Sequence, residues 1–568
     1  MDKIQKVKND MIFKWASVPF AILCVLVGGA SYNLFAYFTQ IGALQGYGPT
    51  TMTIIKYVVL FGYYLGLIPG QIVKTMGPMI TLIIAGVMSI ISWSVLGWIT
   101  NSGEGSTLNW CLMMFFLFTG AISGSFATMA SFVSIVKTFP DSAATLLVVI
   151  LMADYKIAPY LEYSIRAGFL SDPDLMWYFI SVGAVMCLIF VISAFVVRII
   201  DIDLAIERIM EKYDVAGLLI FVLFEALMLA LFYVIALIYE DWFVGAIIFV
   251  SFIALNFLLV GIAFKVVYDQ LKKSSAKDFM KSSQGEKRKQ VEFSDMLGKG
   301  KFHCLVFASM CIIGLGATFT FNIFQIAFAY GEADSGDHLL DTIWAADMLG
   351  RFGCGLLAYF LYESANVNNY HFAIFGSATV AIGFGIVLLT EALGGIALFT
   401  GSILIGFGSG TMWVIVPCIL IDDAGELNFG LNWGYSLFWN AFGMLVFGET
   451  FDWIYEWQAG GSDQCTGGAC VLIQFIFFGL IALTGVALSW YALQTDEKVG
   501  QKKPAKGEKE RKSKGDKKDR GRSKSKDKKE KSSKDKSSKD KSAKKSSSKS
   551  KDKSRKRDSS KGRSKAKA

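Results

Sequence analysis

The chain has 568 residues, of which 53% are hydrophobic, and its mean hydropathy is positive. Its formal net charge of +9 combines two unlike parts, because residues 498–568 carry a net +23 and residues 1–497 a net −14. This balance excludes an ordinary soluble globular protein and argues against nucleic-acid binding, and it favours an acidic membrane-embedded body with a basic tail.

Apolar runs of about 20 residues with few internal charges recur along the chain from Trp15 onward. A helix of roughly that length crosses a hydrocarbon core of about 30 Å. The sequence therefore predicts an all-α polytopic membrane protein with about 14 spans, grouped as six, two and six. The predicted spans are 15–38, 52–73, 78–99, 109–135, 142–168, 175–199, 214–238, 242–265, 303–330, 338–361, 371–391, 396–421, 431–451 and 471–493.

This grouping predicts two six-helix bundles with two extra helices between them. Internal duplication of this kind is common among membrane transporters. The predicted segments are an N-terminal cytoplasmic segment at 1–14, the first bundle at 15–199, the two additional helices at 200–265, a basic cytoplasmic loop at 266–302, the second bundle at 303–493 and a Lys/Ser-rich tail at 494–568.

Basic residues are concentrated in three regions that an even number of spans places on one side of the membrane. Four Lys lie in residues 1–14, ten Lys or Arg in residues 265–301, and 33 in the tail. Lys and Arg collect on the cytoplasmic side of membrane proteins. We therefore expect cytoplasmic N- and C-termini in a multi-pass protein of the plasma membrane or an endomembrane.

The tail contains mainly Lys, Ser and Asp, so it cannot bury enough apolar surface to fold alone, and we expect it to be disordered. Two interpretations remain open. The tail is either only a solvated appendage, or it binds anionic lipids or cytoplasmic proteins.

Most of the nine cysteines fall inside apolar segments, where a thiol behaves as a small hydrophobic group. Cys465 and Cys470 instead close CTGGAC, a Gly-rich polar loop that is compatible with a short disulfide on the oxidising side of a membrane. The three histidines show no metal-ligand spacing. We predict no metal and no cofactor, and the absence of a nucleophile elbow or a phosphate-binding loop predicts that the chain is not an enzyme.

Charges inside a membrane span are costly, so a charge that is retained there indicates a cavity or a partner. Asp347 and Arg351 are four residues apart and lie on one helix face. One interpretation is a structural ion pair near a helix end. The other is a substrate site, in which Arg351 binds an anionic group and Asp347 is its protonatable partner.

Four more charged residues of the predicted spans are candidates for a role in the membrane. Lys56 either extends to the membrane surface or faces a cavity. Asp154, like Lys156 two residues later, needs a partner on another helix, and Glu225 lies in the middle of the seventh span, away from its ends. Asp347, Asp154 and Glu225 are the candidate proton-coupling residues.

A short internal similarity links the first helices of the two predicted bundles, because residues 32–35 read YNLF and residues 321–324 read FNIF. Two halves facing one central site would show such a repeat, although chance similarity is the alternative. Asn33, Asn322 and nearby Gln325 are therefore candidate substrate-binding residues.

The segment GFGSGTMWVIVP at 406–417 contains a GxGxG pattern, but it lies in a predicted span with no strand before it. Close helix packing is the better interpretation. Trp413, Tyr435 and Asn440 are further candidates for lining a substrate cavity, and contact with lipid is the alternative for the aromatic side chains.

These segments resemble the nodulin-like branch of the major facilitator superfamily. The similarity is carried by GFGSGTMWVIVP with Asp422-Asp423 and GELNFGLNWG after it, by CTGGAC, by KTFPDSAAT and by LGRFGCG, and Lys56 falls where that branch carries a Lys. The resemblance extends from about Trp15 to Trp490. It implies a membrane transporter fold.

Asp347 with Arg351 is also similar to the Asp and Arg of monocarboxylate transporters, although the first span here lacks the Lys of those proteins. This resemblance implies an anion on Arg351 and a proton on Asp347. We therefore predict a secondary active transporter of a small solute, an organic anion or similar nutrient, working by alternating access with proton coupling. The alternative is a non-transporting receptor or scaffold that recruits partners through its basic tail.

Overall fold

In the computed structural model, one compact unit spans Met1–Gln501. Residues 274–289 of the predicted loop 266–302, most of the predicted tail and Asn33 lie outside the described residues. The residues that the structure describes are 2–30, 38–47, 49–102, 106–139, 141–169, 175–200, 211, 213–225, 227, 242–273, 290–460 and 465–501.

The described residues are almost entirely helical and contain no strand, so the all-α polytopic prediction is confirmed. Eight stretches are long and apolar enough to cross a membrane within the described part, and the count of fourteen stays a prediction. Residues 213–225 are also helical. The longer elements are α1 (Asp2–Ala30), α2 (Phe38–Gln45), α3 (Pro49–Tyr64), α4 (Leu67–Thr100), α5 (Thr107–Thr138), α6 (Asp141–Phe169), α7 (Leu175–Val196), α9 (Trp242–Lys273), α12 (Gly300–Phe321), α13 (Ile323–Ala329), α14 (Gly336–Leu349), α15 (Gly355–Ala365), α16 (Tyr370–Val387), α18 (Gly395–Ala424), α19 (Phe429–Ala459) and α20 (Ala469–Gln501); the short helices are α11 (Phe293–Leu297) and α17 (Thr390–Leu393).

Several predicted spans are interrupted in the structure. The predicted span 52–73 is broken between α3 and α4 at residues 65–66. The gap between the predicted spans 52–73 and 78–99 instead lies within α4, which bends at Gly77, whose φ of 82° suits only glycine readily and which precedes Pro78. Asn322 separates α12 from α13, and a π-helical segment, Gly350–Cys354, separates α14 from α15. Such breaks free backbone groups, so they are expected where other side chains line a cavity.

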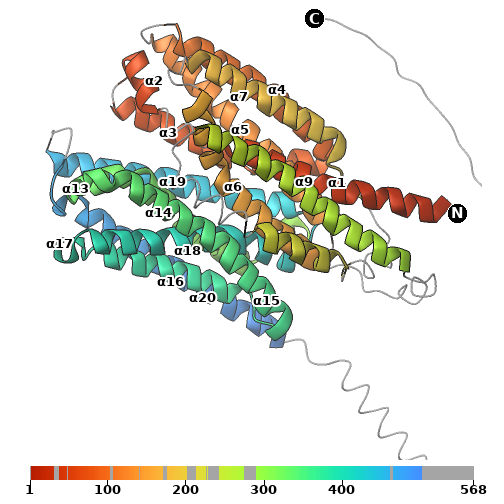
Figure 1. Cartoon of the computed structure of the whole chain (residues 1–568). Helices are drawn as coiled ribbons and strands as arrows, with labels where there is room; N and C mark the ends of the chain where they lie inside the picture. Colours follow the sequence, from red (N-terminus) through yellow and green to blue (C-terminus); the bar gives the residue numbers. More distant parts are fainter. Residues whose placement is uncertain are drawn as a thin grey trace, which may run out of the picture. The chain divides into compact units, whose positions relative to one another are not determined.

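The helices form two groups (Figure 1). In the first, α4 packs against α5 and α7, and α1 packs against α5, α6 and α9. In the second, α16 packs against α18 and α20, and α12 packs against α19 and α20. The groups meet where α3 and α4 contact α19 and where α6 contacts α14, α15 and α18. A central site can therefore take side chains from both groups.

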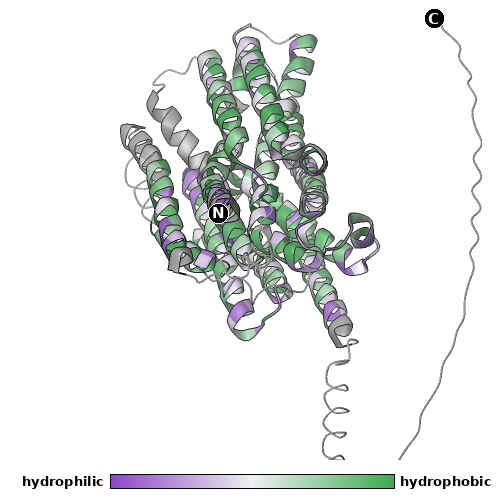
Figure 2. Ribbon diagram, turned by 90° about the vertical axis from the view of Figure 1, so that its right-hand side faces the viewer, coloured by the Kyte–Doolittle hydropathy of each residue, from purple (hydrophilic) through white to green (hydrophobic). Residues whose placement is uncertain are grey.

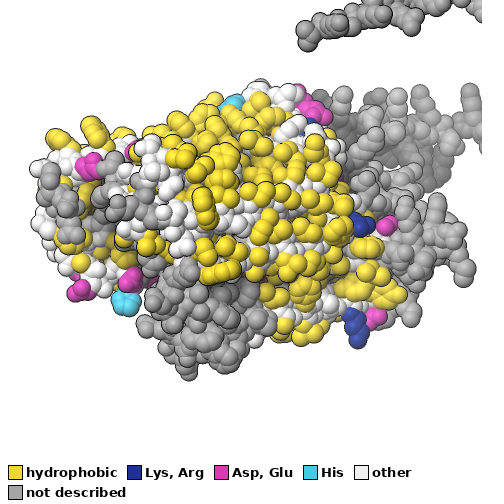
Figure 3. Space-filling view, turned by 90° about the horizontal axis from the view of Figure 1, so that it is seen from above, with side chains coloured by type: hydrophobic (Ala, Val, Ile, Leu, Met, Phe, Trp, Pro, Cys, Tyr) yellow, Lys and Arg dark blue, Asp and Glu magenta, His cyan; other side chains and the backbone are white. Residues whose placement is uncertain are grey.

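Large apolar side chains are exposed on the outer surfaces of the helices, including Trp98, Phe115 and Ile396 at 63%, 59% and 79%. Green hydrophobic colouring runs along most helices in Figure 2, and purple residues are more frequent near their ends. Figure 3 shows a broad hydrophobic area in the middle of one face, with charged side chains toward its two ends. This distribution is that of a protein surrounded by acyl chains.

Glycines allow the close helix contacts. An added Cβ on Gly406 or Gly410 of α18 would meet the backbone of α14 at Ile343 or Asp347, and one on Gly408 would meet α16. The GxGxG segment therefore packs helices, as the sequence indicated. Across the two groups, Gly70 of α4 approaches Gly430 of α19 in the same way.

A buried ion pair links α1 to the helical residues 213–225. The ammonium of Lys14 lies 2.7 Å from the carboxylate of Asp214, both side chains are fully buried, and Lys14 lies 4.4 Å from the ring centre of Phe139. Lys14 is the last residue of the predicted cytoplasmic segment 1–14, and its contact with Asp214 attaches the additional helix to the first group.

We expect Lys14→Met to lower the free energy of unfolding by about 3–5 kcal/mol, because it leaves the Asp214 carboxylate buried and unpaired. The double variant K14M/D214L should recover most of this loss. Thermal unfolding of the purified chain measures the effect, with the exposed Arg198→Met as control. Equal melting temperatures for wild type and K14M would show that the pair is energetically unimportant.

Candidate functional site

Three charged side chains meet between the two groups of helices. Arg351 lies in the π-helical segment one turn after Asp347, and its Nε donates to Asp347 Oδ1 at 2.7 Å while its Nη2 donates to Oδ2 at 3.3 Å. Lys156 of α6 reaches Asp347 Oδ2 from the other group at 2.8 Å. The predicted ion pair is therefore part of a triad that bridges the two groups.

The triad is almost removed from solvent, since Asp347 and Arg351 are only 5% and 2% exposed. Arg351 also donates from Nη1 to the Met152 carbonyl of α6 at 3.3 Å. Its guanidinium carbon lies 5.0 Å from the Trp413 ring centre, and the Lys156 ammonium lies 5.8 Å from that of Trp344. With two cations and one carboxylate, the triad keeps one positive charge, which is available to an anion.

The triad lines a small cavity, in which the centre of a water-sized sphere can move through about 20 Å³. In the described conformation this space is large enough for water but not for an organic ion. Both groups of helices contribute to its wall, so relative movement of the groups would change access to it. The lining residues are Tyr64, Tyr155, Lys156, Gly316, Ala317, Thr320, Asp347, Arg351, Ser409, Trp413 and Met444.

A second cavity of similar size adjoins the first, because Tyr64, Tyr155 and Trp413 line both. The described residues of its wall are aromatic, aliphatic or hydroxyl-bearing and carry no formal charge. Its remaining lining residues are Tyr63, Ser125, Thr128, Met129, Phe132, Met152, Trp433 and Leu437.

Of the residues singled out from the sequence as substrate-binding, Asp347, Arg351 and Trp413 line the first cavity. Lys156 was absent from that set, although its charge inside a predicted span was the signal that could have identified it. The sequence shows that Lys156 needs a partner, but only the packing of α6 on α14 shows that the partner is Asp347.

Lys56 and Asn322 come together in a separate cluster next to the cavity. The Lys56 ammonium donates to the carbonyl of Phe321 and to Asn322 Oδ1, both at 3.3 Å. The neighbouring Tyr57 hydroxyl donates to Asp452 of α19 at 3.2 Å. This cluster, which we call the far-end latch, joins α3 to the break between α12 and α13, toward the end of the unit where α2, α13 and α17 lie (Figure 1).

Three other candidates lie elsewhere. Gln325 is exposed on α13. Tyr435 lines neither cavity and stacks on Phe302 with ring centres 5.6 Å apart. Asn440 is buried and accepts a hydrogen bond of 2.8 Å from Ser309, which ties α19 to α12. A direct role of these three in substrate binding stays a prediction.

Asp154 of α6 and Glu225 of the helical residues 213–225 are both fully buried and close enough to influence each other electrostatically. None of their carboxylate oxygens has a hydrogen-bond partner among the described residues. Ionised carboxylates only accept hydrogen bonds, so a bond between these two side chains requires a proton. Asp154 lies two residues before Lys156 on α6, outside the wall of both cavities.

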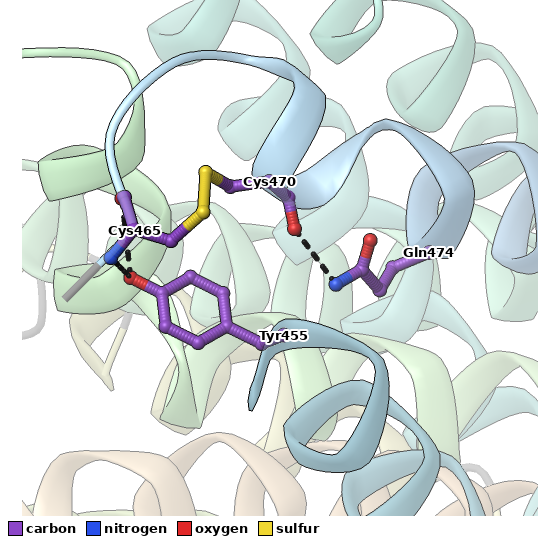
Figure 4. The surroundings of a disulfide bond; sticks show 4 residues. All are labelled: Tyr455, Cys465, Cys470 and Gln474. Atoms are coloured by element: carbon purple, nitrogen blue, oxygen red, sulfur yellow. Dashed lines mark hydrogen bonds between the residues drawn. A yellow bond between two sulfur atoms is a disulfide. The ribbon is translucent and has the colours of Figure 1, made fainter. Parts of the chain in front are cut away.

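Cys465 and Cys470 form a disulfide between the end of α19 and the start of α20, with Cα atoms 5.9 Å apart (Figure 4). The Tyr455 hydroxyl accepts a hydrogen bond from the Cys465 amide at 3.2 Å, and Gln474 donates to the Cys470 carbonyl at 2.9 Å. The described residues contain no cluster of His, Cys, Asp and Glu suited to a metal ion.

The far-end latch gives a testable expectation. Lys56→Met removes the two hydrogen bonds that Lys56 donates across the groups, and hydrogen bonds to charged groups contribute about 1.5–3 kcal/mol each. We expect a Thr320→Cys reporter in the cavity wall to be labelled by a membrane-impermeant thiol reagent at least about 10-fold faster in the K56M background.

The matched control for this variant is Lys74→Met, which removes an exposed lysine of α4. The reagent can also label the native cysteines, and the labelling of a Thr320→Ser variant measures this background. If K56M and K74M gave the same labelling rate at residue 320, the latch would not hold the far end closed.

The sequence and the fold were compared with known proteins. The Nodulin-like family model matches residues 14–266, which confirms the resemblance for the first predicted bundle and the two additional helices. No curated protein sequence matches the chain.

Among solved structures, the major facilitator superfamily proton:xylose symporter XylE bound to 6-bromo-6-deoxy-D-glucose is similar with a TM-score of 0.55, at 13% identity over 84% of this chain and 95% of that chain. The xylose transporter XylE from E. coli in a partially occluded inward open conformation has a TM-score of 0.48, at 13% identity over 85% of this chain and 98% of that chain. The E. coli fucose:proton symporter FucP has a TM-score of 0.43, at 14% identity over 85% of this chain and 99% of that chain.

At 13% identity, the first of these similarities describes the fold alone. The chain therefore has the fold of the major facilitator superfamily and is a multi-pass integral membrane protein. Its resemblance to monocarboxylate transporters stays a prediction.

Proposed function

We propose that this nodulin-like chain is a secondary active transporter that carries a small organic anion through the cavity between its two groups of helices, together with a proton. The observation that carries the proposal is the triad, in which Lys156 and Arg351 share one carboxylate, Asp347. A buried site with an excess positive charge and a cavity beside it favours an anionic ligand. No catalytic step is part of this proposal.

The triad can exchange one carboxylate for another. In the described conformation the Asp347 carboxylate is paired with both Arg351 and Lys156, so a substrate carboxylate must compete with it for these cations. Protonation of Asp347 would remove that competition and leave Arg351 with a planar fork suited to a carboxylate. One proton and one monoanion would then enter together, and the charge of the buried site would be the same before and after loading.

The same triad connects ligand binding to movement. Lys156 belongs to the first group of helices, whereas Asp347 and Arg351 belong to the second. An anion placed between Lys156 and Arg351 would keep the groups together during the occluded state. Release of the anion and proton on the other side would restore the direct contact to Asp347.

The Asp154–Glu225 pair is the second candidate proton site. Both acids are buried away from the cavity, and a proton shared between them would turn repulsion into a hydrogen bond. Because Asp154 and Lys156 lie on one helix, a change at the pair would alter the position of the lysine. Glu225→Gln distinguishes the sites: it should abolish proton coupling only if the pair carries the transported proton.

Alternating access requires that the cavity be closed from one end at a time. The far-end latch closes one end, and close packing of α4 on α19 at Gly70 and Gly430 lies toward the other. We propose that these two contacts open in turn. The concentration of Lys and Arg in residues 265–301 supports a cytoplasmic location for the end opposite to the latch, in the plasma membrane or an endomembrane.

A binding experiment tests the anion specificity. Purified protein in detergent is heated with acetate or with the neutral isostere acetamide, because only a ligand that binds the folded state raises the melting temperature. We expect stabilisation by acetate and none by acetamide at equal ionic strength. A shift with acetamide equal to that with acetate would contradict an anion site.

A further inference from the structure

The two adjoining cavities differ in chemistry. The first contains the triad, whereas the second is lined by uncharged residues within the described part of the chain. Tyr64, Tyr155 and Trp413 form the boundary that both share. The two walls therefore match a molecule with a charged end and an apolar body, which enters when the two groups of helices move apart.

The boundary and the second cavity are built from rings in close contact. The centroids of Tyr64 and Trp413 are 5.2 Å apart with 33° between their planes, and those of Tyr63 and Tyr155 are 5.6 Å apart with 38°. Trp433 meets Trp413 edge to face at 6.2 Å. Aromatic rings in such arrangements prefer further rings as neighbours, in offset-stacked or edge-to-face contact.

The second cavity also offers one polar contact. The hydroxyl of Thr128 is buried in its wall and has no hydrogen-bond partner among the residues that the structure describes. Buried polar groups usually have a partner. A ligand that reaches this wall could give the Thr128 hydroxyl a hydrogen-bond partner, whereas a ligand confined to the triad would leave the hydroxyl without one.

From these observations we infer that the preferred substrates are aromatic monocarboxylates, with the carboxylate at Arg351 and Lys156 and the ring in the second cavity. The inference rests on the proposed function, because it extends the anion site by a compartment for the body of the anion. The substrate class then follows from two features together: one excess positive charge and an adjoining aromatic chamber. Sugars, which lack a charge and a large apolar face, fit neither feature.

Binding of acetate, benzoate and cyclohexanecarboxylate to the purified full-length chain tests the inference by calorimetry. We expect benzoate to bind at least about 10-fold more tightly than acetate, because burial of a ring removes much more apolar surface from water than burial of a methyl group. Cyclohexanecarboxylate should bind less tightly than benzoate, since it lacks ring stacking.

A variant that fills the second cavity separates it from the charged site. Ser125→Phe places a ring in the wall of the second cavity, where Ser125 is 6% exposed. We expect the variant to lower benzoate affinity to the level of acetate and to leave acetate affinity unchanged. Ser181→Phe, at an exposed position on α7, is the control.

If Ser125→Phe does not fold, Leu437→Ala gives the opposite change by widening the second cavity. In the widened cavity, the ratio of the affinity for 2-naphthoate to the affinity for benzoate should rise at least about 10-fold. An unchanged ratio would overturn the inference.

The outcomes distinguish the inference from the proposed function. Equal affinities of wild type for acetate and benzoate, or an equal loss of both in Ser125→Phe, would overturn the aromatic compartment and leave the anion site intact. Tighter binding of cyclohexanecarboxylate than of benzoate would overturn the aromatic preference. Failure of every carboxylate to bind would overturn the proposed function itself.

Discussion

Replacing Arg351 with Met is expected to reduce carboxylate uptake into proteoliposomes by at least about 100-fold. The guanidinium is the one group of the triad with a planar fork that matches a carboxylate, and hydrogen bonds to charged groups contribute about 1.5–3 kcal/mol each. Two such bonds lost from a bound anion correspond to at least about two powers of ten in affinity. Initial rates of uptake of a radiolabelled carboxylate measure the loss.

The fold should survive this substitution, because Lys156 remains to pair with Asp347 at 2.8 Å. Arg351→Lys keeps the charge but loses the fork, so its rate should lie between those of wild type and R351M. Arg198→Met serves as the control, since Arg198 is exposed and lies outside both cavities. Uptake by R351M at the rate of R198M would exclude Arg351 from the substrate site.

Replacing Asp347 with Asn is expected to separate anion binding from proton coupling. Asparagine has nearly the shape of the protonated acid but carries no exchangeable charge, so Lys156 and Arg351 stay available to the anion at every pH. We expect D347N to bind a carboxylate at least about 10-fold more tightly than wild type at neutral pH. Uptake driven by a pH gradient should be lost, while exchange of labelled for unlabelled anion continues.

The sign of the pH effect in wild type follows from the same scheme. A proton on Asp347 frees the two cations, so acidification on the side from which the anion enters should raise uptake, whereas D347N should show no such rise. Asp341→Asn, on the same helix and outside the cavity wall, is the matched control. A pH-driven uptake by D347N equal to that of wild type would place the transported proton elsewhere, and the Glu225→Gln variant then tests the Asp154–Glu225 pair.

Much of the fold was predictable because lipid imposes simple rules on the sequence. Apolar runs of about 20 residues predicted helices such as α16 and α18, and the structure has helices in those positions. Interruptions were harder to predict. The breaks at Asn322 and at Gly350–Cys354 depend on contacts with other helices, because the hydropathy of each span continues across them.

The candidate site was predictable in part for the same reason. Asp347 and Arg351 were recognisable because their partner is one turn away on the same helix, and this spacing is visible in one sequence. Lys156 and Lys56 have partners that are far away in the sequence, so only tertiary packing identifies them. Tyr435 was proposed as an aromatic residue of a late span, yet aromatic residues also pack against one another, as it does against Phe302.

A structure of the purified protein with bound 4-bromobenzoate would test the central claim most directly, since anomalous scattering from the bromine locates the ligand independently of the protein. The account predicts a carboxylate within hydrogen-bonding distance of Arg351 and Lys156 and a ring in the adjoining aromatic cavity. A ligand bound away from both cations, with Asp347 still joined to Lys156 and Arg351, would contradict it.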